Sequence, residues 1–216
     1  MKAIGDLHVI TDATLQNRYT HAELARQVAR GGASVVQFRE KRPWTTRELV
    51  ATAVSVRAAL AGTGTALVVN DRADVAAAAR AAGLHLGRHD LDPAAARRLL
   101  GTECLLGGTA NSLEEAVRVG ATDVDYLGVG PVFGTRSKAD PAPALGLDGL
   151  RRIVAAVAKP VIAIGTLTAE RVPEVMDTGV HGVAVLSAVV CDADPEAAAR
   201  RFRAALDRWR REAGPA

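Results

Sequence analysis

Aromatic residues, cysteines and long apolar runs are scarce in this 216-residue chain, and each scarcity excludes a class of protein. Phe, Trp and Tyr make up 3% of the residues, too few for the stacking platforms that bind single-stranded nucleic acids. No apolar run reaches the roughly 18 residues that a membrane-spanning helix needs. The two cysteines, Cys104 and Cys191, imply no disulfide framework. We therefore expect neither a nucleic acid nor a membrane among the partners of the protein.

The rest of the composition is that of an ordinary globular domain. Hydrophobic residues make up 49% of the chain, enough for a large core, and charged residues 24%. The formal net charge of +3 is modest. A single domain over residues 1–216 accommodates this length. The first residues lack an apolar signal core, which predicts a cytoplasmic location.

Apolar runs and helical stretches alternate along the chain eight times. The expected strands are residues 7–11, 35–41, 66–69, 84–87, 104–108, 126–130, 160–165 and 182–187. The expected helices are residues 21–30, 47–61, 73–82, 93–100, 112–119, 147–157, 168–177 and 195–211. The strands are continuously apolar, as in a parallel sheet that is buried on both faces. Eight such units predict a (β/α)8 TIM barrel, an α/β fold.

A doubly wound open sheet is the alternative fold. Its nucleotide-binding form needs a glycine-rich turn after the first strand, and Thr11-Asp12-Ala13-Thr14 is not one.

The second expected strand, residues 35–41, begins with apolar residues and ends with charged ones. Side chains alternate between the two faces of a strand, so Gln37, Arg39 and Lys41 share one face. Glu40 lies on the other face, where a structural pairing is expected. The shared face is either a clamp for an anion or simply the solvated end of a strand. The stretch alone favours neither interpretation.

Polar residues concentrate at the carboxyl ends of the expected strands, where active sites of such barrels lie. These residues are Gln37, Arg39, Lys41, Asn70, Asp71, Arg72, Arg88, His89, Asp90, Thr109, Asn111, Thr135, Ser137, Lys138, Thr166 and Ser187. The amino ends are poorer in polar residues. Solvation would act equally at both ends, so the asymmetry favours the anion clamp.

The polar residues divide into two chemical groups. Arg39, Lys41 and Lys138 are cations that suit a phosphate or diphosphate. Asp71 and Asp90 are carboxylates of neighbouring units that could share Mg²⁺, which typically takes one or two carboxylates plus phosphate oxygens. Together they predict a metal-bridged diphosphate. The alternatives are that Asp71 caps the third helix and that Asp90 is an ordinary turn residue.

A second anion site is expected at the loops after the seventh and eighth strands. Barrels often bind phosphate there through backbone N–H groups. Gly165 and Ser187 occupy these positions. The alternative for Gly165 is an ordinary turn glycine.

The chain resembles the thiamine-phosphate synthase family, also called thiamin phosphate pyrophosphorylase. The matching segments occur in order over nearly the whole chain. They are residues 36–41, 69–74, 84–87 with Asp90, 112–116, 130–133 with Thr135, Ser137 and Lys138, 163–165 and 182–187. Each segment alone is weak, but the ordered set is specific.

The resemblance implies a transferase that joins hydroxymethylpyrimidine diphosphate to thiazole phosphate, with Mg²⁺ held by Asp71 and Asp90. The pyrimidine methylene would lose diphosphate before the thiazole nitrogen attacks, so no general base is needed. By resemblance, the pyrimidine diphosphate contacts Gln37, Arg39, Lys41, Asn70, Thr109 and Lys138. The thiazole phosphate contacts Thr135, Ser137, Gly165, Leu186 and Ser187. The catalytic set is Arg39, Lys41, Thr109 and Lys138.

Several positions depart from the family pattern. Thr166 replaces a second glycine, where a side chain could crowd the phosphate or add a hydroxyl donor. Thr109 replaces a serine and keeps the hydroxyl. Arg88, His89 and Asn111 stand where glutamine, an acidic residue and histidine are usual.

Two other functions stay open. A thiazole tautomerase shares this barrel, but it would have histidine at Asn111 and would lack Asp90. The second open function is a non-catalytic, phosphate-binding regulatory barrel. Such a protein would show the replacement of the family's second glycine by Thr166. A homodimer is compatible with such a barrel, although no residue decides the point. The arginines of the last helix are expected to form a solvated face.

Overall fold

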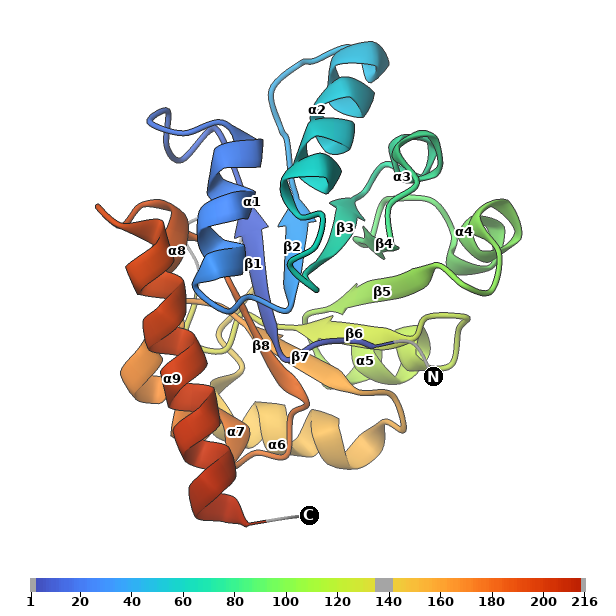
Figure 1. Cartoon of the computed structure of the whole chain (residues 1–216). Helices are drawn as coiled ribbons and strands as arrows, with labels where there is room; N and C mark the ends of the chain where they lie inside the picture. Colours follow the sequence, from blue (N-terminus) through green and yellow to red (C-terminus); the bar gives the residue numbers. More distant parts are fainter. Residues whose placement is uncertain (1–2, 135–141, 215–216) are drawn as a thin grey trace.

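Eight parallel strands close into a barrel, as the sequence predicts (Figure 1). A computed structural model describes residues 3–134 and 142–214. The strands are β1 (Leu7–Thr11), β2 (Val35–Phe38), β3 (Ala66–Asn70), β4 (Gly83–Leu86), β5 (Leu105–Ala110), β6 (Tyr126–Val129), β7 (Val161–Ile164) and β8 (Gly182–Val185). Each strand pairs with the next, and β8 pairs with β1 to close the ring.

Helices follow the strands and surround the barrel (Figure 1). They are α1 (His21–Arg30), α2 (Thr46–Ala59), α3 (Ala73–Ala79), α4 (Pro93–Leu100), α5 (Leu113–Gly120), α6 (Gly146–Ala156), the 3₁₀ turn η1 (Ala169–Arg171) with α7 (Val172–Met176), α8 (Ser187–Val190) and α9 (Pro195–Ala213). Thr20 and Thr45 form capping boxes with Glu23 and Glu48, which fixes where α1 and α2 begin. No helix of the described residues is long and apolar enough to cross a membrane.

Two expected strands run at least two residues past the observed carboxyl end. β2 ends at Phe38 instead of residue 41, and β8 ends at Val185 instead of residue 187. The charged residues after Phe38 form ion pairs in a loop, and Ser187 begins the unpredicted short helix α8. The strand alternation that placed Gln37, Arg39 and Lys41 on one face therefore applies only to Gln37.

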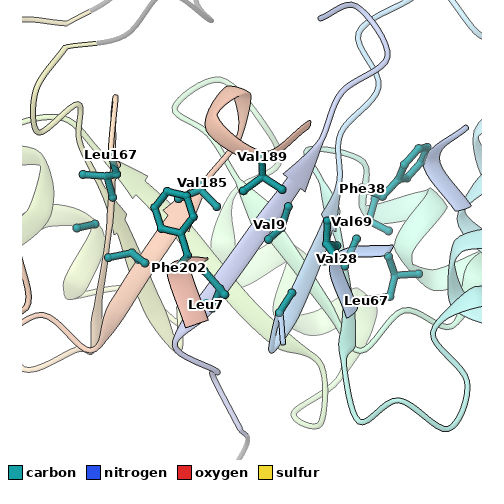
Figure 2. Close-up of a cluster of buried hydrophobic side chains, with 14 of the residues drawn as sticks. Leu7, Val9, Val28, Phe38, Leu67, Val69, Leu167, Val185, Val189 and Phe202 are labelled. Carbon is teal, nitrogen blue, oxygen red and sulfur yellow. The ribbon is translucent and has the colours of Figure 1, made fainter. Parts of the chain in front are cut away.

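The alternation of side chains along each strand builds two apolar layers. One layer lies between the strands and the helices, and Figure 2 shows Leu7, Val185 and Phe202 within it. The other fills the barrel interior and consists of Ile10, Val35, Val68, Leu105, Tyr126, Ile162 and Ala184. Because the interior is filled, the barrel is a packed scaffold, and ligands have to bind at its ends.

The interior also contains a polar group of rings. The ring centroids of His8 and Tyr126 lie 5.4 Å apart, and His85 lies against Tyr126 at 5.6 Å. Gly107 and Gly128 make room for them: a Cβ on Gly107 would lie 2.3 Å from the Tyr126 ring, and one on Gly128 2.8 Å from His85. Large interior side chains are thus matched by glycines on neighbouring strands.

The last helix is tied to the amino end of the barrel by ion pairs. The guanidinium of Arg203 donates to both carboxylate oxygens of Asp6, at 2.8 and 2.7 Å, and Arg210 adds a contact of 2.5 Å. Burial alone would raise the pKa of Asp6, but these arginines and Ser34 hold it well below its usual value. The expectation of a solvated arginine face is therefore wrong for Arg203, whereas Arg210 stays exposed although it is paired with Asp6.

Candidate active site

The predicted site residues that the structure describes lie at the carboxyl ends of the strands. Gln37, Asn70 and Thr109 occupy positions that alternate with the outward-facing apolar residues of β2, β3 and β5, so they face the interior. Gln37 is buried, whereas Asn70 and Thr109 are partly exposed. They form the polar top of the interior layer. The predicted residues Thr135, Ser137 and Lys138 lie outside the described residues.

The two cations after β2 diverge toward neighbouring strands. Arg39 forms an ion pair with Asp12, the residue after β1, whose side chain is fully buried. Lys41 forms an ion pair with Asp71, the residue after β3. The side chain of Lys41 is 45% exposed, against 18% for Arg39. Both cations thus sit over the barrel mouth, each held by a carboxylate.

Asp71 and Asp90 come together at the ends of β3 and β4. Burial and the neighbouring Asp71 carboxylate raise the pKa of Asp90 above its usual value. The Asp90 carboxylate also accepts a hydrogen bond of 2.6 Å from the N–H of Gly87, so it shapes its turn as well. The alternative that Asp71 caps the third helix is wrong. Arg72 occupies the N-cap position of α3, and no side chain forms a capping hydrogen bond to this helix.

Asp71 has a left-handed backbone, with φ of 64°. Aspartate tolerates this conformation better than most residues. The N–H of Asp71 donates to the carbonyl of His85 in β4 at 2.8 Å, which fixes the turn. The backbone of Asp71 is thereby held beside the end of β4.

Thr109 is held from inside the barrel. Its hydroxyl oxygen lies 2.9 Å from Nε2 of His85, and Nδ1 of His85 lies 3.1 Å from the hydroxyl of Tyr126. Burial raises the pKa of Tyr126, so its hydroxyl stays protonated. His85 thus has a hydrogen-bonded packing role, and the chain of bonds orients the Thr109 hydroxyl.

The predicted phosphate corner lies at the ends of β7 and β8. Gly165 is buried with φ of 121°, and a Cβ there would lie 2.6 Å from Cα of Pro131. The close approach of the segment after β6 therefore requires glycine at this position. Leu186 packs against the interior layer, and Ser187 is exposed at the start of α8. The structure brings Gly165, Leu186 and Ser187 to the same end as the paired cations.

A buried brace lies behind the β2 loop, and sequence reasoning missed most of it. Nδ1 of His21 lies 2.7 Å from the hydroxyl of Thr11, and its Nε2 lies 3.2 Å from Glu40. Glu40 also accepts two bonds of 3.0 Å from Nε of Arg42 and one of 2.6 Å from its Nη2. Burial opposes ionisation of Glu40, but these partners outweigh it and lower its pKa to about 2.

Asp12 is the other site residue that sequence reasoning missed. It follows directly after the first strand, so the signal was the one that identified Asp71: an acidic residue at a strand end. Its carboxylate accepts bonds from the N–H of Thr14 at 2.8 Å and from the Thr14 hydroxyl at 2.6 Å, in addition to Arg39. Asp12 thus fixes the orientation of Arg39.

The other departures from the family pattern are structural or solvent-exposed. Arg88 forms an ion pair with Glu115 in α5. His89 is exposed. The side-chain amide of Asn111 donates to the carbonyl of Gly130, and its backbone N–H donates to Glu115 at 2.8 Å. Asn111 therefore joins the ends of β5 and β6.

Comparison with known proteins identifies the family to which this chain belongs. The family model described as thiamine monophosphate synthase matches residues 7–189. The chain belongs to this family. A thiamine-phosphate synthase of Salinibacter ruber is 47% identical over 212 residues, covering 98% of this chain and 93% of the relative. One of Methanoculleus marisnigri is 46% identical over 198 residues, covering 92% and 93%. The prediction of a transferase in the thiamine-phosphate synthase family is confirmed.

Solved structures agree with this membership of the thiamine monophosphate synthase family. The thiamine phosphate pyrophosphorylase of Pyrococcus furiosus superposes with a TM-score of 0.85 at 35% identity, covering 94% of this chain and 96% of that one. A 3-hexulose-6-phosphate synthase superposes with a TM-score of 0.65 at 19% identity, over 93% and 99%. The second likeness concerns the fold alone, and the predicted TIM barrel is confirmed.

Proposed function

We propose that the protein joins hydroxymethylpyrimidine diphosphate to thiazole phosphate, releasing pyrophosphate and forming thiamine phosphate. One observation supports this most: Asp71 and Asp90 face each other beside Lys41, at the mouth of a barrel of the thiamine monophosphate synthase family. Two neighbouring carboxylates beside a cation suit a ligand that brings both a metal ion and negative charge.

The donor set fits Mg²⁺. Among the residues that the structure describes, no three His, Cys, Asp or Glu side chains are grouped to hold a metal ion. Mg²⁺ does not need such a cage, because it is usually held by one or two carboxylates together with water and substrate phosphate. Asp71 and Asp90 would hold it, and the chemistry it supplies when bound is neutralisation of the charge that develops on the leaving diphosphate.

The reaction balances without a proton transfer. The bond between the pyrimidine methylene carbon and the diphosphate oxygen breaks, and its electron pair leaves with the diphosphate. The lone pair of the thiazole nitrogen then forms the new carbon–nitrogen bond. Arg39, Lys41 and Lys138 would stabilise the diphosphate as it leaves. Thr109, with Gln37 and Asn70, would hold the pyrimidine.

Lys41 would change partners in this reaction. Its ion pair with Asp71 is partly exposed, with the two side chains 45% and 22% accessible. Such a pair is worth little in water, about 0–1 kcal/mol, so Lys41 can leave Asp71 when a diphosphate arrives. Arg39 would remain on the buried Asp12, where losing the partner is costly. The two cations would therefore act differently on the diphosphate: Arg39 would contact it while staying paired with Asp12, and Lys41 would leave Asp71 to follow it.

The thiazole phosphate would bind at the opposite side of the mouth, through Gly165, Leu186 and Ser187 together with Thr135 and Ser137. These residues follow β6, β7 and β8 in the chain, whereas Arg39 and Lys41 follow β2, and Asp71 and Asp90 follow β3 and β4. Lys138, after β6, would reach the diphosphate from the thiazole side. The two substrates would thus enter from opposite sides of the mouth and meet above Thr109. A cytoplasmic location and a homodimer stay part of the proposal.

Turnover with both substrates tests the proposal. Purified protein with Mg²⁺ should release one pyrophosphate for each thiamine phosphate formed, and omission of either substrate should abolish both products. Thiazole aromatisation is measured in parallel. Aromatisation without joining would support the tautomerase instead, and binding of both substrates without turnover would support a regulatory barrel. The structural role of Asn111 weighs against the tautomerase.

A further inference from the structure

Thr166, directly after Gly165, has an unfavourable backbone conformation. Three non-glycine residues of the described chain have positive φ: Asp71, Arg80 and Thr166, the last at 48°. Of these only Thr166 is β-branched, and a β-branched side chain is the least tolerant of this region. The side chain is exposed, so core packing does not hold it there. Some other interaction has to offset the strain.

The hydroxyl of Thr166 supplies that interaction. It donates a hydrogen bond of 2.8 Å to the carbonyl of Gly134, which lies 32 residues away in the segment after β6. The hydroxyl therefore points toward the neighbouring loop. The sequence predicts that a side chain at this position could donate a hydroxyl hydrogen bond to the phosphate. That bond would compete with the bond to Gly134, because both use the same hydroxyl hydrogen.

The bond extends a ladder that already joins the two segments. The N–H of Val132 donates to the carbonyl of Ile164 at 2.9 Å, and the N–H of Phe133 donates to that of Gly165 at 3.2 Å. Thr166 adds the third contact in register, to Gly134. The guanidinium of Arg171 also lies 3.3 Å from the centroid of the Phe133 ring, against the same segment.

The far side of the segment is paired as well. The N–H of Leu145 donates to the carbonyl of Pro131 at 2.9 Å, and that of Gly146 to the carbonyl of Val132 at 3.0 Å. Val132 is therefore held on both sides, whereas the carbonyl of Gly134 is held by the Thr166 hydroxyl from the loop after β7. In the sequence, Gly134 directly precedes Thr135, a proposed contact of the thiazole phosphate.

We propose that Thr166 is a positioning residue for the thiazole-phosphate side of the site. Its hydroxyl holds the carbonyl of Gly134 and thereby fixes residues 131–134 along the end of β7, beside Gly165. The strained backbone is retained because this bond sets the wall of the phosphate corner. This inference rests on the proposed function for the identity of the substrate, but not for the contact itself.

Three substitutions separate the effect of the Thr166 hydroxyl from the effect of its backbone strain. Thr166→Val keeps the branched shape and removes the hydroxyl, Thr166→Ser keeps the hydroxyl, and Thr166→Gly removes both hydroxyl and strain. The matched control is Thr63→Val, which removes a 2.7 Å hydroxyl bond to the Leu60 carbonyl at the opposite end of the barrel. The measurements are KM for each substrate, kcat, the melting temperature, and hydrogen exchange at the amides of Val132 and Phe133.

Thr166→Val should raise KM for thiazole phosphate about 3- to 10-fold, the effect of losing one hydrogen bond, and leave KM for the pyrimidine diphosphate within about twofold. Exchange at Val132 and Phe133 should accelerate. Thr166→Ser should behave as wild type in KM for thiazole phosphate and in hydrogen exchange. Thr166→Gly should raise the same KM while the melting temperature stays or rises, because glycine adopts this conformation freely. A merely structural residue would move the melting temperature and leave KM alone.

Wild-type KM and wild-type exchange in Thr166→Val would overturn the inference, as would equal effects from Thr63→Val. If the wild-type protein makes no thiamine phosphate, the proposed function fails separately. Exchange at the two amides and the affinity for inorganic phosphate, compared between wild type and Thr166→Val, then decide the role of Thr166. Unchanged values of both would overturn it, and faster exchange with weaker phosphate binding would support it.

Discussion

At the scale of the residue, the candidate site depends on how its charges are paired: Arg39 binds the buried Asp12, and Lys41 binds the partly exposed Asp71. An acid or base at a strand end could be recognised from the sequence, as with Lys41, Asp71 and Asp90. The partners could not, because β2 stops at Phe38 and the following loop turns Arg39 and Lys41 apart. Loop direction depends on contacts with other units, which the alternation within one strand does not report.

His8 gives a residue-scale prediction about pH. Burial lowers its pKa to about 4, although its Nε2 lies 2.8 Å from the carbonyl of Ile4. An unfolded histidine has a pKa near 6.5, so between about pH 6.5 and 4 the unfolded chain binds a proton that the folded chain does not. The free energy of unfolding should therefore fall as the pH falls through this window, by about 2 kcal/mol between pH 7.5 and 5 from His8 alone.

Urea unfolding at both pH values measures this effect. In His8→Gln the loss should be about 2 kcal/mol smaller than in wild type. His89→Gln, at an exposed position, should keep the wild-type loss. Equal losses in wild type and His8→Gln would contradict the buried, neutral state of His8.

At the scale of the element, the β2 loop is held by the brace of Thr11, His21, Glu40 and Arg42. The brace joins β1, α1 and the loop that carries both cations. The expected structural pairing of Glu40 is confirmed, although Glu40 lies in the loop after β2 and not on a strand face. The contribution of α1 could not be predicted, because His21 has no distinguishing neighbours in the sequence.

Glu40→Gln should loosen this loop. A neutral amide cannot serve Arg42 and His21 as the carboxylate does, since bonds to ionised groups are roughly twice as strong. We expect KM for the pyrimidine diphosphate to rise and kcat to fall, with kcat/KM about tenfold lower. KM for thiazole phosphate should stay near wild type. Steady-state kinetics of Glu40→Gln beside Glu114→Gln, an exposed control in α5, measure the difference.

Loss of thermal stability without any kinetic change would show that the brace serves folding alone. Equal rises of KM for both substrates would also contradict a role confined to the β2 side. The control Glu114→Gln should leave all constants unchanged.

Element boundaries were predicted best where local chemistry marks them. Ser112 accepts from the N–H of Glu115 at 3.1 Å and caps α5, within one residue of the expected helix start. The short helix α8 was missed because its four residues, Ser187–Val190, read as a continuation of an apolar strand. The conformation of Thr166 was beyond sequence reasoning as well, since its strain depends on a bond to a distant segment.

At the scale of the whole molecule, the alternation of eight apolar runs with eight helical stretches was enough to predict the closed barrel. The expectation that polar residues concentrate at the carboxyl end of the barrel was only partly right. The carboxyl end carries the candidate site, but the amino end has its own charged group around Asp6, which ties α9 to the barrel. Its arginines come from the last helix, far from Asp6 in sequence, so the contact could not be predicted.

The central claim is that Asp71 and Asp90 make the carboxyl end of the barrel a magnesium–diphosphate site. Titration calorimetry of inorganic pyrophosphate into the protein tests it most directly, with Mg²⁺ and with a chelator. We expect binding with Mg²⁺ that weakens at least about tenfold with the chelator, and as much in Asp71→Asn or Asp90→Asn with Mg²⁺. Asp123→Asn, an exposed control, should bind as wild type does. Equal affinity with and without Mg²⁺, or unchanged affinity in both site variants, would contradict the claim.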